Sequence, residues 1–285
     1  MNNFREKLLK NEFVVTAELC PPKGPDMTVF REKARLMKGL VDAVNITDNQ
    51  RAIMRMCALA GARIAQEEGL DPILQFTCRD RNRIGIQSDL LGAAGFGISN
   101  VLALTGDYVS EGDHIHAKGV YDLDSTLLIK AMMSLNDGLD LSGKKLNAKT
   151  DFFIGAAMNP CAEPPAPHRL SFERKIASGA RFFQTQVIFE MEKFAGFMEY
   201  AKEFPVKIIA GVLLVKSVKM ALFLNDNVPG VHVPDDIIKK LEGALDPLKA
   251  GIEIARGQIN ELRSICHGVH LMTIGHEERI IDILK

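Results

Sequence analysis

Eight short apolar, β-rich runs alternate with stretches of helical spacing, and this alternation is the strongest constraint on the fold of the 285-residue chain. A short continuous apolar run is typical of a strand buried on both faces, as in a parallel sheet. The predicted strands are residues 13–19, 41–46, 72–77, 100–107, 152–158, 181–188, 206–215 and 269–273. The predicted helices span 27–40, 51–68, 88–96, 125–135, 168–179, 191–204, 247–266 and 277–284, with two further stretches from 217 and 234. This order predicts an α/β fold, a (β/α)8 TIM barrel.

No linker divides the chain, so we expect residues 1–285 to form a single barrel domain. A doubly wound open sheet with an appended helical region is the alternative. The first predicted strand is not followed by G-x-G-x-x-G, and no G-x-x-x-x-G-K-[ST] occurs. Two common nucleotide-binding motifs are therefore absent.

The charge balance argues against polyanionic partners. Lys plus Arg is 35 and Asp plus Glu is 36, for a net charge of -1. We therefore expect no nucleic acid and no membrane as partner, and no apolar run is long enough to span a bilayer. The five cysteines form no C-x-x-C pair, which favours free thiols, no thiolate metal site and a cytoplasmic location.

Polar residues stand at the carboxyl ends of the predicted strands. In a barrel these ends converge on one face, so they form one candidate site. The residues are Glu18, Thr47, Gln75, Thr77, Thr105, Gly106, Asp107, Asn159, Gln186, His270 and Thr273. Apolar neighbours such as Val15 and Leu19 favour Glu18 as a proton donor, while Asp107 stays charged. The alternative is that both carboxylates pair with loop arginines.

Two basic segments are candidates for binding phosphate. His168, Ser171 and Arg174 are spaced to share one helix face, with Lys175 beside it, and Arg79, Arg81 and Arg83 follow the third strand. Solvent-facing charges explain both patterns equally well. The histidine pairs 114/116 and 267/270 lack accompanying metal-ligand spacing, so we predict no metal site.

Several strand-end motifs together resemble the methylenetetrahydrofolate reductase family. They are T-A-E-L-C-P-P at 16–22, Q-F-T-C at 75–78, L-A-L-T-G-D at 102–107, and the segment 175–186. Each motif is short, but their order on successive strand ends is fairly specific. The resemblance continues to H-L-M-T at 270–273 and so covers essentially the whole chain.

The resemblance implies a flavin-dependent barrel that reduces 5,10-methylenetetrahydrofolate to 5-methyltetrahydrofolate, with hydride from reduced flavin N5. Glu18 matches the family's general acid, and Asp107 matches the aspartate beside flavin and pterin. Gln186 and Phe223 correspond to folate-contacting positions, with Phe223 one place out of register. The flavin, FAD or alternatively FMN, is expected to contact Thr47, Gln75, Thr105, Gly106, Asp107, Tyr121, His168, Arg174 and Lys175.

Departures from the family pattern concentrate on one side of the site. Gln75 replaces a common histidine, Thr105 a common arginine, His168 an aspartate and Ser171 an asparagine, and Gly275-His276 replaces Asn-Arg. The electron donor is accordingly expected to be either NAD(P)H or a partner redox subunit, and the chain an oligomer or a subunit of a complex. Two competing hypotheses are a non-catalytic folate-binding barrel within a methyl-transfer complex and a flavin-free pterin-binding methyltransferase or lyase.

Overall fold

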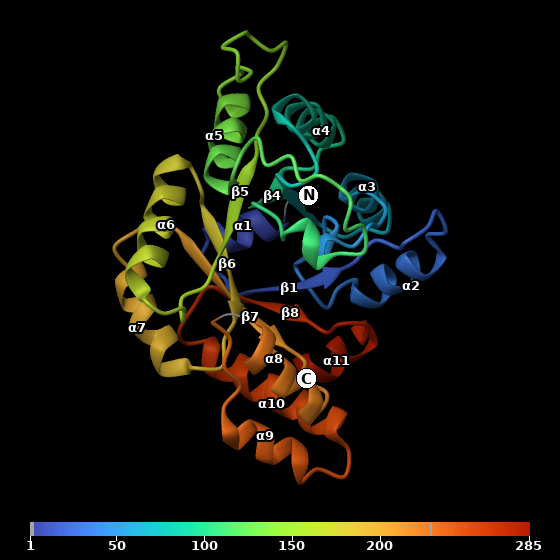
Figure 1. The fold of residues 1–285 in the computed structure, drawn as a ribbon, viewed down its shortest axis with the longest axis vertical. Coiled ribbons are helices and arrows are strands. Elements are labelled where there is room, and N and C mark those ends of the chain that lie inside the picture. Colours follow the sequence, from blue (N-terminus) through green and yellow to red (C-terminus); the bar gives the residue numbers. More distant parts are fainter. Residues whose placement is uncertain (1–2, 229) are drawn as a thin grey trace.

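Eight parallel strands form a closed barrel in the computed structural model, which describes residues 3–228 and 230–285 (Figure 1). The strands are β1 (Val14–Leu19), β2 (Ala43–Ile46), β3 (Pro72–Thr77), β4 (Asn100–Leu104), β5 (Phe153–Met158), β6 (Phe182–Val187), β7 (Lys207–Leu213) and β8 (Gly268–Met272). Each strand pairs with its sequence neighbours, and pairing of β1 with β8 closes the barrel, with Thr16 opposite His270. The predicted (β/α)8 barrel is confirmed, and the open sheet is excluded.

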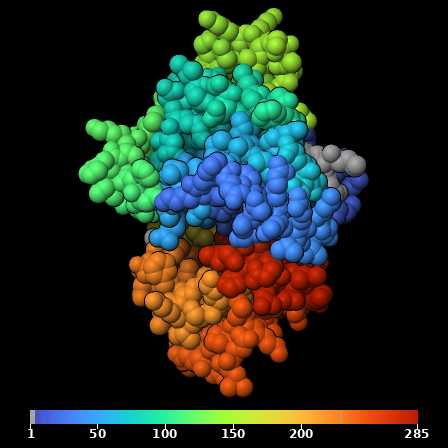
Figure 2. Space-filling model, turned by 90° about the vertical axis from the view of Figure 1, so that its right-hand side faces the viewer, coloured from blue at the N-terminus to red at the C-terminus, as the bar shows by residue number. Residues whose placement is uncertain are grey.

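Helices surround the barrel (Figure 1). They are α2 (Thr28–Met37), α3 (Ala58–Glu67), α4 (Arg83–Gly95), α5 (Ser125–Asn136), α6 (Pro165–Ser178), α7 (Met191–Ala201), α8 (Val218–Asn227), α9 (Asp235–Glu242), α10 (Pro247–Leu262) and α11 (Ile280–Leu284). Single 3-10 turns occur at η1 (Gln50–Ala52), η2 (Val109–Glu111) and η3 (Glu277–Arg279). Figure 2 shows the C-terminal segment, in red, directly against the N-terminal third, in blue, as expected for a closed barrel.

Three of the helices that begin at residues other than those predicted do so for a clear local reason. The helix predicted from 51 begins at Ala58, because Arg51 and Ala52 adopt left-handed backbone angles (φ 57° and 54°) that a right-handed helix excludes. The helix predicted from 88 begins at Arg83, because the Asn82 side chain accepts hydrogen bonds from the Ile84 and Gly85 N–H groups. The helix predicted from 168 begins at Pro165, in keeping with the preference of proline for a first helical turn.

The charged N-terminal segment contains a helix, α1 (Asn3–Leu9), that the sequence pattern did not predict. Its Phe4 and Leu8 are fully buried against the amino-terminal ends of the strands. The Phe4 ring packs edge-on against Phe182 at 5.3 Å between centroids. Helix α1 therefore closes one end of the barrel and leaves the carboxyl end for ligands. Residues 1–2 of the predicted domain lie outside the described residues.

The connection between β7 and β8 holds three helices, α8, α9 and α10, gathered on one side of the barrel (Figure 1). A second, smaller apolar core lies under them and includes Val187, Phe189, Leu213 and Val233. Within the described residues, no helix combines the length and apolar character needed to cross a membrane.

Candidate active site

A cavity of ≈ 410 Å³ lies at the carboxyl ends of the strands, on the face opposite α1. Its polar lining comes from β1, β3, β6, β8, the loops after β2 and β5, and helix α6. These residues are Glu18, Gln50, Gln75, Asn159, His168, Ser171, Lys175, Gln184, Thr185, Gln186 and His270. A second hollow of ≈ 450 Å³ adjoins it and shares Glu18, Gln50 and Met272. Convergence of strand ends thus brings together five predicted site positions: Glu18, Gln75, Asn159, Gln186 and His270.

Glu18 lies near the end of β1 with its side chain 18% exposed. Its Oε1 accepts a 3.4 Å hydrogen bond from Gln50 Nε2 and lies 3.9 Å from His270 Nε2. Its side chain therefore contacts an amide and an imidazole, and no arginine pairs with it among the described residues. This corrects the alternative in which a loop arginine neutralises Glu18.

A buried polar network inside the barrel continues from Glu18. His270 Nδ1 lies 2.9 Å from Thr16 Oγ1, which also accepts a 3.4 Å bond from Gln184 Nε2. Gln184 and Asn45 exchange two hydrogen bonds, of 2.6 and 3.0 Å. Sequence reasoning missed Thr16, Asn45 and Gln184, although each stands two residues before a predicted site position. The period of two along a strand places such residues on the same inward face.

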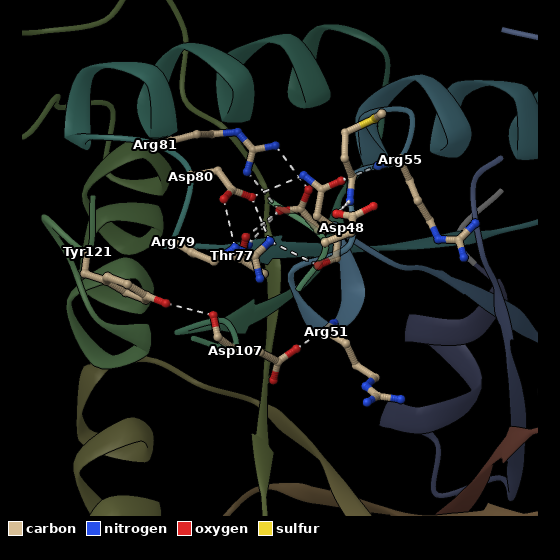
Figure 3. Close-up of polar contacts among 12 residues, drawn as sticks. Asp48, Arg51, Arg55, Thr77, Arg79, Asp80, Arg81, Asp107 and Tyr121 are labelled. Carbon is tan, nitrogen blue, oxygen red and sulfur yellow. Dashed lines mark hydrogen bonds and ion pairs between the residues drawn. The ribbon is translucent and has the colours of Figure 1, made fainter. Parts of the chain in front are cut away.

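Asp107 does not line the cavity; it is exposed on the loop after β4 (Figure 3). Its carboxylate accepts a 2.7 Å bond from the Arg51 backbone N–H, and its carbonyl accepts a bond from Tyr121 Oη. Gly106, at φ 94°, turns the chain away from the strand direction just before it. The expected convergence of Asp107 with Glu18 is therefore indirect: Gln50 contacts Glu18, and the next residue, Arg51, contacts Asp107.

Five other expected flavin contacts also lie outside the cavity lining: Thr47, Thr105, Gly106, Tyr121 and Arg174. Thr47 is buried, and its hydroxyl has no hydrogen-bond partner among the described residues. Thr105 Oγ1 accepts a 3.2 Å bond from Ser125 N at the start of α5. Gly106 has a φ of 94°, which side chains rarely adopt, and a Cβ atom there would lie 3.2 Å from Thr77 Cβ, so the turn favours glycine.

Helix α6 presents His168, Ser171 and Lys175 to the cavity. Arg174, expected on the same face, is exposed and does not line it, because successive helical residues are rotated by about 100°. Lys175 Nζ donates a 2.8 Å bond to the Ala157 carbonyl. Burial lowers the pKa of Lys175, and the charge of Asp124 partly opposes this effect.

The three arginines after β3 are paired with carboxylates, which argues against the phosphate hypothesis for this segment. Figure 3 shows two of them, Arg79 and Arg81, beside Asp80 and Asp48. Arg79 pairs with Asp80, and Arg83 with Asp122, each at 2.8 Å. Arg81 pairs at 2.8 Å with Asp48, whose side chain is fully buried. The cluster therefore anchors the loop after β3 instead of offering free positive charge.

Of the remaining residues singled out in the sequence, one lines the cavity and two lie elsewhere. Gln186 lines the cavity and accepts a 3.1 Å bond from Val187 N, whereas Phe223 on α8 is 46% exposed and lies outside the lining. His267 Nδ1 accepts a 3.1 Å bond from Ile208 N, and burial lowers its pKa. Across the described ranges, no group of three His, Cys, Asp or Glu side chains is arranged to hold a metal ion.

A closed (β/α)8 barrel with a carboxylate, several amides and a half-buried ammonium group at the carboxyl end of its strands has the architecture of a barrel enzyme. Residues 3–285 match the sequence profile of the family described as methylenetetrahydrofolate reductase. The chain belongs to that family.

Two curated relatives agree with this assignment. A "Probable methylenetetrahydrofolate reductase (NADPH)" of Caenorhabditis elegans is 27% identical over 230 residues, covering 76% of this chain and 32% of the relative. "Methylenetetrahydrofolate reductase 2" of Schizosaccharomyces pombe is 23% identical over 247 residues, covering 78% of this chain and 36% of the relative. The chain thus spans about a third of the length of the curated relatives it matches.

Solved structures share the fold. One is an uncharacterized protein from Clostridium thermocellum that binds two copies of 5-methyl-5,6,7,8-tetrahydrofolic acid. It superposes with a TM-score of 0.69 at 17% identity, covering 99% of this chain and 97% of that one. Oxaloacetate acetylhydrolase superposes with a TM-score of 0.54 at 11% identity, covering 96% and 80% of the two chains. At these identities the likeness concerns the fold alone.

Proposed function

We propose that the protein reduces 5,10-methylenetetrahydrofolate to 5-methyltetrahydrofolate with a bound flavin, and that Glu18 is the general acid. The observation that carries the proposal is Glu18 at the carboxyl-end cavity, beside amide and imidazole groups and, within the described residues, without an arginine partner. Family membership supports it, as does the tetrahydrofolate bound by the Clostridium thermocellum neighbour.

The residues present fit a flavin, FAD or FMN. Lys175 offers a half-buried ammonium group that donates a hydrogen bond to the Ala157 carbonyl oxygen, and Gln75 offers an amide on the wall of the same cavity. The hydroxyl of Thr47 is buried, and no described residue uses its hydrogen-bonding capacity. The Lys175 and Gln75 donors, which line the cavity, suit the carbonyl and nitrogen edge of an isoalloxazine ring, whereas Thr47 lies outside the lining. We propose that Gln75, His168 and Lys175 hold it, with Thr47, Thr105, Gly106, Asp107, Tyr121 and Arg174 as further contacts.

A bound reduced flavin supplies the hydride. The chain's own contribution is proton transfer and orientation. Glu18 in its carboxylic acid form donates a proton to the folate amine nitrogen that leaves as the imidazolidine ring opens, which yields an electrophilic iminium carbon. Gln186 orients the pterin through its amide, and Asp107 stabilises positive charge that develops on the substrate. Phe223, exposed on α8 outside the cavity lining, is a proposed further contact with the substrate.

The test begins with the whole chain as purified. The protein is expected to be yellow or to take up added FAD or FMN, and the mass of the cofactor released on denaturation distinguishes the two. Addition of 5-methyltetrahydrofolate to the oxidised holoprotein should bleach the flavin absorption by running the reaction in reverse. A colourless protein that takes up neither flavin would refute the proposal.

A second candidate is a non-catalytic barrel that binds folate within a methyl-transfer complex. The observation in its favour is the exposed position of Phe223, away from the cavity. Such a protein would bind 5-methyltetrahydrofolate, yet the isolated chain would show no flavin reduction by it. Turnover by the isolated chain excludes this candidate.

We further propose that residues 1–285 act as one cytoplasmic domain. Its electron donor is proposed to be NAD(P)H or a partner redox subunit, within an oligomer or a larger complex. Stopped-flow mixing of the oxidised holoprotein with NADH or NADPH distinguishes direct reduction from a requirement for a partner.

A further inference from the structure

The buried ring of His270 connects Thr16 to Glu18. Its Nδ1 lies 2.9 Å from Thr16 Oγ1, and its Nε2 lies 3.9 Å from Glu18 Oε1. The residue is only 4% exposed, so protein groups, not solvent, determine which nitrogen carries the proton. The tautomer of this ring decides what kind of partner Glu18 has.

The hydrogen bonds around Thr16 favour one arrangement. Its hydroxyl has one hydrogen, and the Val269 carbonyl lies 3.4 Å away as an acceptor for it. The lone pairs of the hydroxyl then accept from Gln184 Nε2, at 3.4 Å, and from His270 Nδ1. Every contact of the Thr16 hydroxyl is used in this arrangement, and it requires a hydrogen on His270 Nδ1.

The tautomer of His270 matters because the charges around Glu18 affect whether its carboxyl keeps a proton. Lys175 and His168 on α6 line the same cavity, and Lys33, Arg51, Arg55 and Glu277 line the adjoining hollow. Most of these groups are cationic and favour the ionised carboxylate, whereas a general acid must hold its proton. An imidazole lone pair is an acceptor that stabilises the protonated carboxyl.

We infer that Thr16 holds His270 as the Nδ1–H tautomer, so that the Nε2 lone pair accepts a hydrogen bond from the protonated carboxyl of Glu18. The 3.9 Å separation of Glu18 Oε1 from His270 Nε2 must shorten by about 1 Å for this bond to form. Gln50 holds the Glu18 carboxyl only through a 3.4 Å bond, which leaves it room to move. His270 is thus a positioning residue that keeps the proton of Glu18 directed and available. The inferred tautomer rests on the contacts of Thr16, while the catalytic consequence rests on the proposed function.

The tautomer is measurable by NMR on the full chain, without flavin or substrate, after labelling histidine with 15N. Spectra are recorded near pH 8, where imidazoles are mostly neutral because their usual pKa is about 6.5. His270→Gln assigns the signals. The expected result is a protonated Nδ1 in the wild type and in Thr16→Ser, and a switch to Nε2–H in Thr16→Val. A protonated Nε2 in the wild type, or no change in Thr16→Val, would overturn the inference.

Two substitutions of His270 separate its contacts in the holoprotein. The Gln carbonyl can take the place of Nε2 and accept from Glu18, whereas Asn reaches only toward Thr16. His270→Gln is expected to reduce methylenetetrahydrofolate at least about tenfold faster than His270→Asn, with equal flavin content. Equal rates would contradict the positioning role. If the wild type itself shows no turnover, the proposed function fails, and the NMR result still decides the tautomer.

Discussion

The side chains of Asn45 on β2 and Gln184 on β6 exchange two hydrogen bonds, of 2.6 and 3.0 Å, inside the barrel. Both residues are at least nine-tenths buried, so neither amide has water as a ready substitute partner. The pair supports Thr16 through Gln184 and, through Thr16, the ring of His270. The polar interior of the barrel is therefore a scaffold for the groups around Glu18.

Breaking this amide pair is expected to destabilise the fold. Gln184→Met leaves the Asn45 amide buried without its partner, which should lower the free energy of unfolding by about 1–3 kcal/mol. The double variant Asn45→Leu/Gln184→Met should lose less than the sum of the two single variants. Urea unfolding of the four proteins measures the coupling, and strict additivity would show that the pair has no energetic role.

Glu18→Gln tests the general acid. The amide keeps the size of the side chain but cannot donate the proton, so folate turnover should fall by about 10²–10⁴-fold while flavin uptake is retained. Glu203→Gln, on an exposed residue distant in sequence from the cavity, is the matched control. Rapid-reaction kinetics of reduced holoprotein with 5,10-methylenetetrahydrofolate provide the measurement. Unchanged turnover would remove Glu18 from the mechanism.

The ion pair of Arg81 with Asp48 should contribute far more to the stability of the fold than the ion pair of Arg83 with Asp122. The Asp48 side chain is fully buried, and its Oδ2 accepts a bond from Thr77 Oγ1 as well as from Arg81. Arg81→Met leaves this carboxylate without its cation and should cost about 3–5 kcal/mol. Arg83→Met breaks the solvent-accessible pair with Asp122 and should cost much less, because water screens that pair. Thermal unfolding of the two variants compares them; similar losses would contradict the burial argument.

Asp71 should make the stability of the protein depend on pH. Burial raises the pKa of this carboxyl to about 6, against 3.8 in the unfolded chain, although Phe4 N–H and the Asn100 amide favour its ionised form. Because the folded state holds the proton more tightly, stability falls as pH rises from about 4 to 6, by up to about 3 kcal/mol.

Asp71→Asn removes this titration and should flatten the pH dependence of urea unfolding between about pH 4 and 7. Asp226→Asn, at an exposed aspartate, is the control and should leave the slope as it is in the wild type. An unchanged slope in Asp71→Asn would show that this carboxyl is not the source.

Gly112 controls the contact between the loops that follow β2 and β4. A Cβ atom there would lie 2.0 Å from the Ala52 carbonyl oxygen, so Gly112→Ala must push η1 away from η2. The bond from Arg51 N–H to Asp107 should weaken, and hydrogen exchange at the Arg51 amide should accelerate by about tenfold or more. Gly95→Ala, where no atom lies within 4 Å, should leave that exchange rate unchanged.

Local sequence patterns were sufficient to predict the barrel fold and some of the residues that line the cavity. Continuous apolar runs identify strands buried on both faces, and parallel strands separated by helices leave few topologies. Glu18, Gln75, Asn159, Gln186 and His270 could be assigned to one cavity because each stands at or near a strand end. Helix α1 was missed because its buried face consists of only Phe4 and Leu8 within a charged segment.

Only the tertiary structure decided which polar groups meet. Asp107, like Glu18, is a carboxylate at the end of a predicted apolar strand. The left-handed backbone of Gly106 and the contact with the η1 turn nevertheless place Asp107 outside the cavity. The pairing of Asn45 with Gln184 joins residues 139 positions apart, and no local pattern specifies such a contact. Strand periodicity determines which way a side chain points, whereas its partner across the barrel depends on how the eight strands close.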